Sequence, residues 1–148
     1  MPDTPVPLAP FHLAIPVDDI AAARRFYGSA LGLAEGRSDT KWIDWNLYGH
    51  QLVTHEVDTE RDTARSIAGT NPVDGHEVPV PHFGVVLTVP DFHQLAGKLR
   101  EADIDFVIEP YVRFEGEPGE QWTMFFTDPA GNALEFKAFA DLDQLFAK

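Results

Sequence analysis

The sequence predicts an α+β protein built from two βαβββ modules in one chain. The first observation is a repeat: an apolar strand with a histidine, an acidic residue, a helix and several strands occur in this order twice. His12 opens the first copy and His82 the second, at an offset of 82 − 12 = 70 residues. The second observation is that each predicted helix precedes three strand-like segments separated by turn residues, which favours this class of fold.

The first module spans residues from about 10 to 57. Its opening strand is the apolar segment 11–17, and Asp19 then offers a side chain that can cap the free amides of a helix N-terminus. A helix is expected from Asp19 to about Ala30, because apolar side chains recur there at helical spacing. Three strands are predicted after it, near 34–38, 41–47 and 50–57.

The second module spans residues from about 81 to 139. It opens with the strand 82–89, and a helix is expected from Asp91 to about Ala102, where apolar residues form one stripe. Pro90 supports a break between strand and helix. Three strands are again predicted, near 105–114, 121–127 and 133–139.

The two modules form one domain over residues 1–148. Residues 58–80 connect them and are rich in Asp, Glu, Thr, Pro and Gly, so we expect a long loop with a helical turn around 63–68. The tail, 140–148, is expected to form a short terminal helix.

Charge narrows the choice of partners. The chain has 24 Asp and Glu against 11 Lys and Arg, which gives a formal net charge of −13. Nucleic acids and anionic membranes bind to basic surfaces, so we expect neither as a partner. A small molecule is the expected ligand.

The chain has no cysteine, which excludes disulfides, zinc–thiolate sites, iron–sulfur clusters and thiol nucleophiles. The first ten residues lack the basic and apolar segments of a signal peptide. No apolar run approaches the ~20 residues of a membrane span. These features favour a cytoplasmic protein.

Strand alternation singles out His12, His82 and Glu135, which point away from their large apolar neighbours. If the modules pair their sheets, the three can converge on one concave surface. Two neutral imidazoles and a carboxylate form a set that binds one divalent ion of Fe, Mn, Zn, Ni or Co and leaves coordination positions open. The alternatives are ordinary core or surface histidines, and a pairing of Glu135 with Lys137 or an arginine.

His55 is a fourth candidate, as a metal ligand or a catalytic residue. It lies on the strand that closes the first module, as Glu135 lies on the strand that closes the second. Pseudo-symmetry therefore predicts that His55 takes the place of Glu135, give or take one residue, with Glu56 as its rival.

Arg113 is a further candidate in the catalytic set with His55 and Glu135. Its guanidinium could hold a substrate carboxylate through two hydrogen bonds. The alternative is an ion pair with Glu115 or Glu120.

Residues 125–136 carry a specific motif, which reads F-x-DP-x-GN-x-LEF. With the His12 strand and the segment from Asp19 to Leu33, this ending resembles the vicinal oxygen chelate superfamily over nearly the whole chain. That group includes glyoxalase I, extradiol dioxygenases, fosfomycin resistance proteins, methylmalonyl-CoA epimerase and bleomycin resistance proteins.

The resemblance implies that the modules pair as a curved, mixed, eight-stranded sheet, a cup with the helices on its outer face. It implies metal ligands at His12, His82 and Glu135, and a substrate held through vicinal oxygens on a metal that acts as a Lewis acid or activates O2. Members often dimerise, so a homodimer is possible. Fold alone does not fix the reaction.

Three departures refine the expected reaction. Glyoxalase I has a glutamate where His55 is expected here, extradiol dioxygenases have a tyrosine where this chain has Phe125, and bleomycin-binding members lack the metal ligands. The resulting prediction is a metal-dependent enzyme acting on a small oxygen-chelating substrate, with a dioxygenase slightly preferred. The alternatives are a lyase or isomerase of glyoxalase type, and a non-catalytic protein that binds a small molecule or drug.

Overall fold

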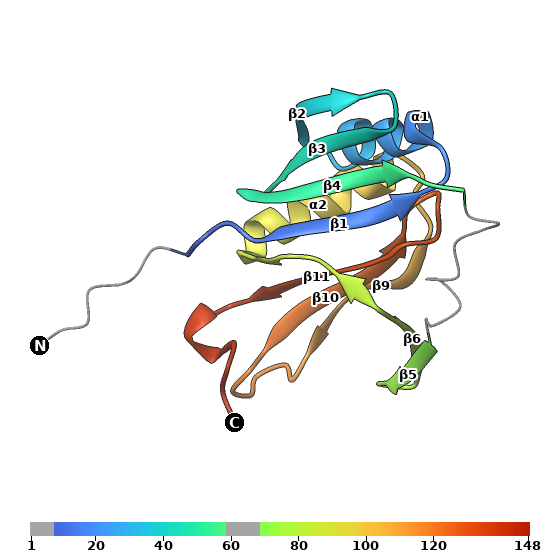
Figure 1. Ribbon diagram of the computed structural model, residues 1–148. Helices are drawn as coiled ribbons and strands as arrows, with labels where there is room; N and C mark the ends of the chain where they lie inside the picture. The colour runs from blue at the N-terminus through green and yellow to red at the C-terminus, as the bar shows by residue number, and fades with distance from the viewer. Residues whose placement is uncertain (1–7, 59–68) are drawn as a thin grey trace, which may run out of the picture.

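The computed structural model describes residues 8–58 and 69–148 and shows two βαβββ modules (Figure 1). The α+β prediction is confirmed. The elements of the first module are β1 (His12–Val17), α1 (Ile20–Ala23) with its π-helical continuation η1 (Arg24–Ala30), β2 (Ala34–Asp39), β3 (Trp42–Leu47) and β4 (His50–Glu56).

The second module is preceded by a hairpin of two strands, β5 (Gly69–Val73) and β6 (His76–Val80). The module itself comprises β7 (His82–Phe83), β8 (Val86–Leu87), α2 (Val89–Glu101), β9 (Phe106–Arg113), β10 (Gln121–Thr127) and β11 (Ala133–Phe139). The described chain then ends with one 3-10 turn, η3 (Leu142–Gln144), which is shorter than the terminal helix expected for the tail.

Each module forms its own sheet, in the order β1-β4-β3-β2 for the first and β7-β11-β10-β9 for the second, where β8 also pairs with β11. The expected single eight-stranded sheet is therefore wrong in one respect: β1 and β7 are the edge strands of two separate hydrogen-bonded ladders. Proline explains this in part, because Pro16 within β1 and Pro81 just before β7 have no N–H to donate across the gap.

Both predicted helices are confirmed, but α2 begins at Val89 rather than Asp91, so Pro90 lies in its first turn and not at the expected break. The side chain of Asp19 accepts hydrogen bonds from the amides of Ala21 and Ala22 and so starts α1. Thr88 plays the same role for α2, where its hydroxyl accepts from the amide of Asp91. The apolar stripe of α2 is buried, and it consists of Phe92, Leu95, Ala96 and Leu99. No helix among the described residues is long and apolar enough to cross a membrane.

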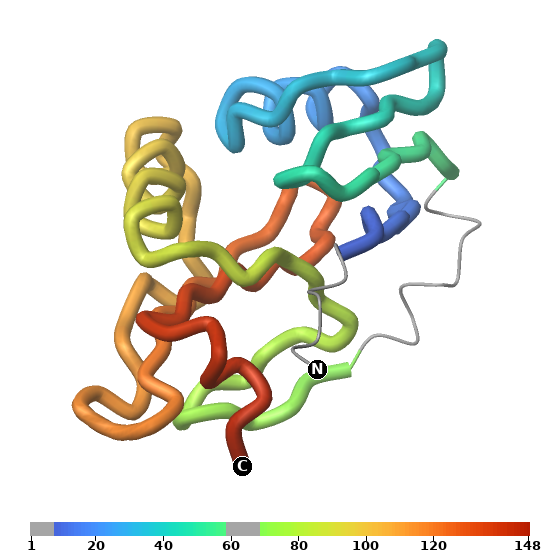
Figure 2. Tube along the Cα trace, turned by 90° about the vertical axis from the view of Figure 1, so that its left-hand side faces the viewer, coloured from blue at the N-terminus to red at the C-terminus, as the bar shows by residue number. Residues whose placement is uncertain are grey.

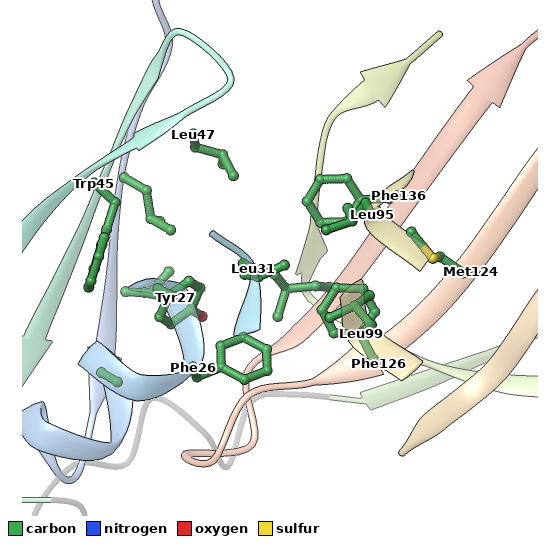
Figure 3. Packing of buried hydrophobic residues seen from close by; sticks show 14 of the residues in the cluster. Phe26, Tyr27, Leu31, Trp45, Leu47, Leu95, Leu99, Met124, Phe126 and Phe136 are labelled. Atoms are coloured by element: carbon green, nitrogen blue, oxygen red, sulfur yellow. The ribbon is translucent and has the colours of Figure 1, made fainter. Parts of the chain in front are cut away.

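One hydrophobic core serves both modules. Figure 3 shows Phe26 and Leu31 of the first module facing Leu99 and Phe126 of the second. A buried polar joint accompanies this packing: the hydroxyl of Tyr27 donates to Oδ2 of Asp128 at 2.7 Å. The modules therefore pack against each other through a shared core.

The connection between the modules differs from the expected long loop. Residues 69–80 form the β5–β6 hairpin, which turns at Asp74 and Gly75 with positive φ values of 49° and 80°. Figure 2 shows this hairpin, in light green, at the bottom of the view and away from the yellow helix α2. The helical turn expected around 63–68 lies outside the described residues.

Candidate metal centre

His82 and Glu135 lie together on the second sheet. Strand β7 runs parallel to β11 with His82 opposite Ala133, so Glu135 is two residues further along the same face. Nε2 of His82 is 3.0 Å from Oε2 of Glu135. The strands can come this close at Glu135 because residue 84 is glycine: a Cβ there would lie 1.6 Å from the carbonyl oxygen of Glu135.

Neighbouring groups hold both side chains in place. Nδ1 of His82 donates to the carbonyl oxygen of Pro79 at 2.7 Å, which leaves Nε2 directed at Glu135. The hydroxyl of Thr123 donates to Oε1 of Glu135 at 2.8 Å, and Nζ of Lys137 lies 3.8 Å from the same oxygen. The ring of Phe125 packs edge-on against His82. Metal-binding histidines are commonly oriented through their second ring nitrogen in this way.

His12 has the same arrangement on the first sheet. Its Nδ1 donates to Oε1 of Gln51 on the adjacent strand at 2.9 Å, and the side chain is otherwise exposed. The structure does not bring His12 to His82 and Glu135: within residues 8–58 and 69–148, no three acidic or histidine side chains gather closely enough to hold a metal ion. The expected convergence of the three on one surface of a single chain is therefore not found.

The strand register corrects the role expected for His55. Gln51 lies opposite His12 just as Ala133 lies opposite His82, so the residue equivalent to Glu135 is Val53. His55 lies two residues beyond Val53 and corresponds instead to Lys137. The pseudo-symmetry prediction for His55 is thus wrong by two positions.

The rival residue, Glu56, points to the helix side of the first sheet. Its Oε2 accepts a hydrogen bond from the amide of Ile20 at 3.0 Å and so helps to satisfy the N-terminus of α1. A carboxylate in this position favours the positive end of the helix, which is a structural role.

Arg113 is paired with the hairpin. Its Nε lies 2.6 Å from Oδ2 of Asp74, and the hydroxyl of Tyr111 donates to the same oxygen at 2.7 Å. The expected ion pair with Glu115 or Glu120 is wrong, because Asp74 comes to Arg113 from the segment that had been expected to be a loop.

The contact between Asp74 and Tyr111 shifts the pKa of both side chains. The hydrogen bond from Tyr111, and then the guanidinium of Arg113, lower the pKa of Asp74. Partial burial, followed by the bond to Asp74, raises the pKa of Tyr111 to about 12. The three side chains therefore form a latch, Asp74–Tyr111–Arg113, that fastens the hairpin tip to β9.

The hairpin covers part of the face that carries Glu135. Val78 of β6 is buried against Ile108, Phe125 and Ala133 of the second sheet. Because Pro79 follows Val78 and accepts the hydrogen bond of His82, the position of this cover also sets the orientation of the imidazole.

Sequence reasoning missed four residues that support the site: Gln51, Pro79, Thr123 and the latch residue Asp74. Strand alternation could have found Thr123, which shares a strand face with Phe125 next to Glu135. The Asp74-Gly75 pair between Val73 and His76 is a hairpin signal that could have predicted β5 and β6.

Comparison with solved structures supports the fold. A protein from Alicyclobacillus acidocaldarius described as a glyoxalase/bleomycin resistance protein/dioxygenase is 31% identical, with a TM-score of 0.72 over 93% of this chain and 96% of that one. A lactoylglutathione lyase from Agrobacterium tumefaciens is 18% identical, with a TM-score of 0.61 over 96% and 98%. The fosfomycin resistance protein FosX from Listeria monocytogenes is 13% identical, with a TM-score of 0.63 over 95% and 98%.

No curated protein matches the chain. The family model for the Glyoxalase/Bleomycin resistance protein/Dioxygenase superfamily matches residues 10–136, which include the first module, the hairpin and the second module up to the middle of β11. The relatives of low identity share the fold and carry names of different activities. On the family match and the 31% identity to the Alicyclobacillus protein, this chain belongs to the glyoxalase/bleomycin resistance protein/dioxygenase superfamily.

Proposed function

We propose that the protein is a metal-dependent enzyme that acts on a small oxygen-chelating substrate, with His12, His82 and Glu135 as the metal ligands. The observation that carries this proposal is the matched state of the two imidazoles. Each uses Nδ1 to donate to an oxygen, of Gln51 or of Pro79, and each thereby keeps Nε2 for a ligand.

The donor set suits a divalent ion of Fe, Mn, Zn, Ni or Co. Such an ion supplies Lewis acidity to the oxygens of a bound substrate and, as Fe(II), a route to O2 chemistry. The protein's own contribution is to hold the donors: Thr123 fixes one carboxylate oxygen of Glu135, so that the other faces Nε2 of His82.

Within this proposal we prefer dioxygenase chemistry to glyoxalase-type lyase chemistry. A glyoxalase-type reaction needs an acid–base group on the last strand of the first module, and the residue equivalent to Glu135 there is Val53. The carboxylate of Glu56 does not supply this group, because it accepts a hydrogen bond from the amide of Ile20 at the N-terminus of α1. Arg113 is excluded from the proposed catalytic set, because Asp74 takes its guanidinium.

The first experiment measures metal content of tag-free protein by inductively coupled plasma mass spectrometry. Near one equivalent of Fe, Mn, Ni, Co or Zn is expected in the wild type, with loss in His12→Ala, His82→Ala and Glu135→Gln. His93→Ala, on α2, is the matched control and should keep its metal. Absence of metal from the wild type after reconstitution would overturn the proposal and favour a small-molecule binding protein.

A second experiment locates the third ligand, because His12 lies apart from the His82–Glu135 pair. Either the two sheets close on one another, or His12 of a second copy reaches the pair. Refolding a mixture of His12→Ala and Glu135→Gln proteins separates these arrangements. Random pairing of copies would restore about one quarter of the sites if they form between copies, and none if each chain builds its own.

The third experiment addresses the reaction. Protein loaded anaerobically with Fe(II) is mixed with oxygen-chelating candidate substrates, and oxygen uptake is recorded. Uptake that depends on both metal and His82 supports a dioxygenase. Turnover of a substrate without uptake would overturn that preference in favour of Lewis-acid chemistry.

A further inference from the structure

A cavity of about 320 Å³ opens between the two modules, beside His82. Residues 13–16 of β1 form one wall, and Pro79, Pro81 and Phe83 line the other side. Ala133, opposite His82 in the ladder, lines it from β11. The cavity therefore lies where the edges of the two sheets come together without pairing.

The cavity is apolar in character. Among residues 8–58 and 69–148, no Asp, Glu, Lys or Arg side chain lines it, and the prolines on its walls have no N–H to offer. Asn132 also lines it, but the Nδ2 of Asn132 is already bonded to the carbonyl of Pro16 at 2.7 Å and to Asp128 at 2.9 Å. A molecule that enters is therefore recognised by its apolar surface, and its polar end has His82 as a neighbour.

Two strand faces connect the cavity with the proposed ligands. His82 lines the cavity, and its Nε2 lies 3.0 Å from Glu135. On β1, Ala14 also lines the cavity and alternates onto the same face as His12. A substrate whose oxygens lie at the ligands would thus have its body beside Ala14 and Ala133.

The volume limits the size of that body. Ligand pockets commonly begin near ~300 Å³, and a cavity of ~150 Å³ is enough for benzene. The cavity here has room for one substituted ring or a branched aliphatic chain.

We propose that this cavity binds the apolar body, one ring or its aliphatic equivalent, of a substrate whose vicinal oxygens would bind a metal ion held by His82 and Glu135. The inference rests on the proposed metal-dependent function. It adds the substrate class: a compact, apolar chelator without a charged group on its ring.

The test compares two hydroxamate chelators that differ in their apolar body. Benzohydroxamate carries a ring and acetohydroxamate a methyl group, and their binding to cobalt-loaded protein is measured by calorimetry. We expect benzohydroxamate to bind about 10- to 100-fold more tightly, from burial of the ring. Ala14→Phe fills the cavity and should abolish this preference while the metal content stays the same.

The matched control is Ala34→Phe. Ala34 is also an exposed alanine on an edge strand, but β2 lies at the far side of the first sheet. This variant should keep the full preference for benzohydroxamate. Equal affinity for the two hydroxamates in the wild type, or a preference that survives in Ala14→Phe, would overturn the inference.

A metal-free measurement separates this inference from the proposed function. In protein with labelled alanine methyl groups, benzohydroxamate should shift the resonances of Ala14 and Ala133 and leave that of Ala34 in place. If cobalt does not bind but these shifts occur, the metal proposal fails and the cavity stands. If cobalt binds and the two methyl groups do not respond, the cavity inference fails alone.

Discussion

The hydroxyl of Tyr27 donates a 2.7 Å hydrogen bond to Oδ2 of Asp128, and the two buried residues are 101 positions apart in the chain. Asp128 also accepts hydrogen bonds from the amides of Ala130 and Asn132. The side chain of Asn132 in turn donates to the carbonyl of Pro16 in the first module. The Asp-Pro-x-Gly-Asn motif is therefore a joint between the modules, and no proposed ligand belongs to it.

Replacing Tyr27 by Phe removes a donor from a buried carboxylate. A hydrogen bond to a charged group contributes ~1.5–3 kcal/mol, so the free energy of unfolding should fall by about 2 kcal/mol in urea denaturation. Tyr48→Phe is the control: Tyr48 is 42% exposed, and its variant should change stability by less than about 0.5 kcal/mol. Equal effects in the two variants would contradict the role of the joint.

The three tyrosines should ionise at a higher pH than tyrosine in an unfolded chain. Burial and then Asp128 raise the pKa of Tyr27 well above its ordinary value, burial and then Asp91 raise the pKa of Tyr48, and the pKa of Tyr111 is about 12. Since each folded pKa exceeds the unfolded one, this stabilisation is complete below pH ~10 and is lost as the pH rises through the folded values.

Ultraviolet absorbance of tyrosinate measures this titration directly. The tyrosines of the native protein should stay largely protonated at pH ~10, where those of the urea-unfolded chain are half ionised. A native tyrosine that ionises with the unfolded chain would show that its environment differs from the one described.

Gly84→Ala should disturb the site through the backbone. The new Cβ would lie 1.6 Å from the carbonyl oxygen of Glu135, so β7 and β11 must separate there. Overpacking of this kind costs about 1–3 kcal/mol. Gly97→Ala is the control, because nothing lies within 4 Å of that position on α2. Thermal unfolding should show a loss of stability for Gly84→Ala and a gain in stability of up to ~1 kcal/mol for Gly97→Ala.

Asp74→Ala should release the hairpin tip from Tyr111 and Arg113. We expect faster hydrogen exchange in β5 and β6, and a pKa of Tyr111 that falls back toward 10. Glu77→Gln, which removes one charge from the same hairpin, is the control and should leave exchange unchanged. The pKa of Asp74 is lowered by folding, so the latch should hold above pH ~4 and weaken as the pH falls below that value. If hydrogen exchange in β5 and β6 is the same in Asp74→Ala as in the wild type, the latch is ruled out.

Thr123→Val removes the donor that fixes Glu135 and nearly preserves side-chain shape. If Glu135 is a ligand, affinity for Co²⁺ should fall about 10- to 100-fold in competition titrations, as is typical for loss of a supporting hydrogen bond. Thr127→Val, at the exposed end of the same strand, should bind Co²⁺ like the wild type. Unchanged affinity in both variants would contradict a ligand role for Glu135.

Local patterns predicted much of this fold. Helical spacing predicted both helices, and the capping residue Asp19 predicted the start of the first, because these features depend on neighbours in sequence. Strand alternation predicted that His82 and Glu135 point away from their apolar neighbours, and the structure brings these two together. His12 shows the limit of such reasoning, since alternation fixes the face of a strand but not the distance between two sheets.

The predicted equivalence of His55 and Glu135 was wrong because the strand register differs from the one expected. Gly49 and Gly131 precede the last strands of their modules and both have a φ of +91°, so counting from these turns aligns Val53 with Glu135. The signal was present in the sequence, but it required equating the two turns. The pairing of Asp74 with Arg113 spans 39 residues and had no comparable signal, because a hairpin tip finds its partner only when the sheet beneath it has formed.

The chain passes from the hairpin into His82 with only two residues after Pro79, whose carbonyl holds the imidazole. For protein engineering this means that the hairpin and the proposed ligand His82 are one continuous unit. Residues 69–77 offer positions for altering which molecules gain entry, whereas a graft that replaces Pro79 would also redirect Nε2 of His82. Substitutions that change access to the site without changing the proposed metal binding therefore belong at residues that precede Pro79.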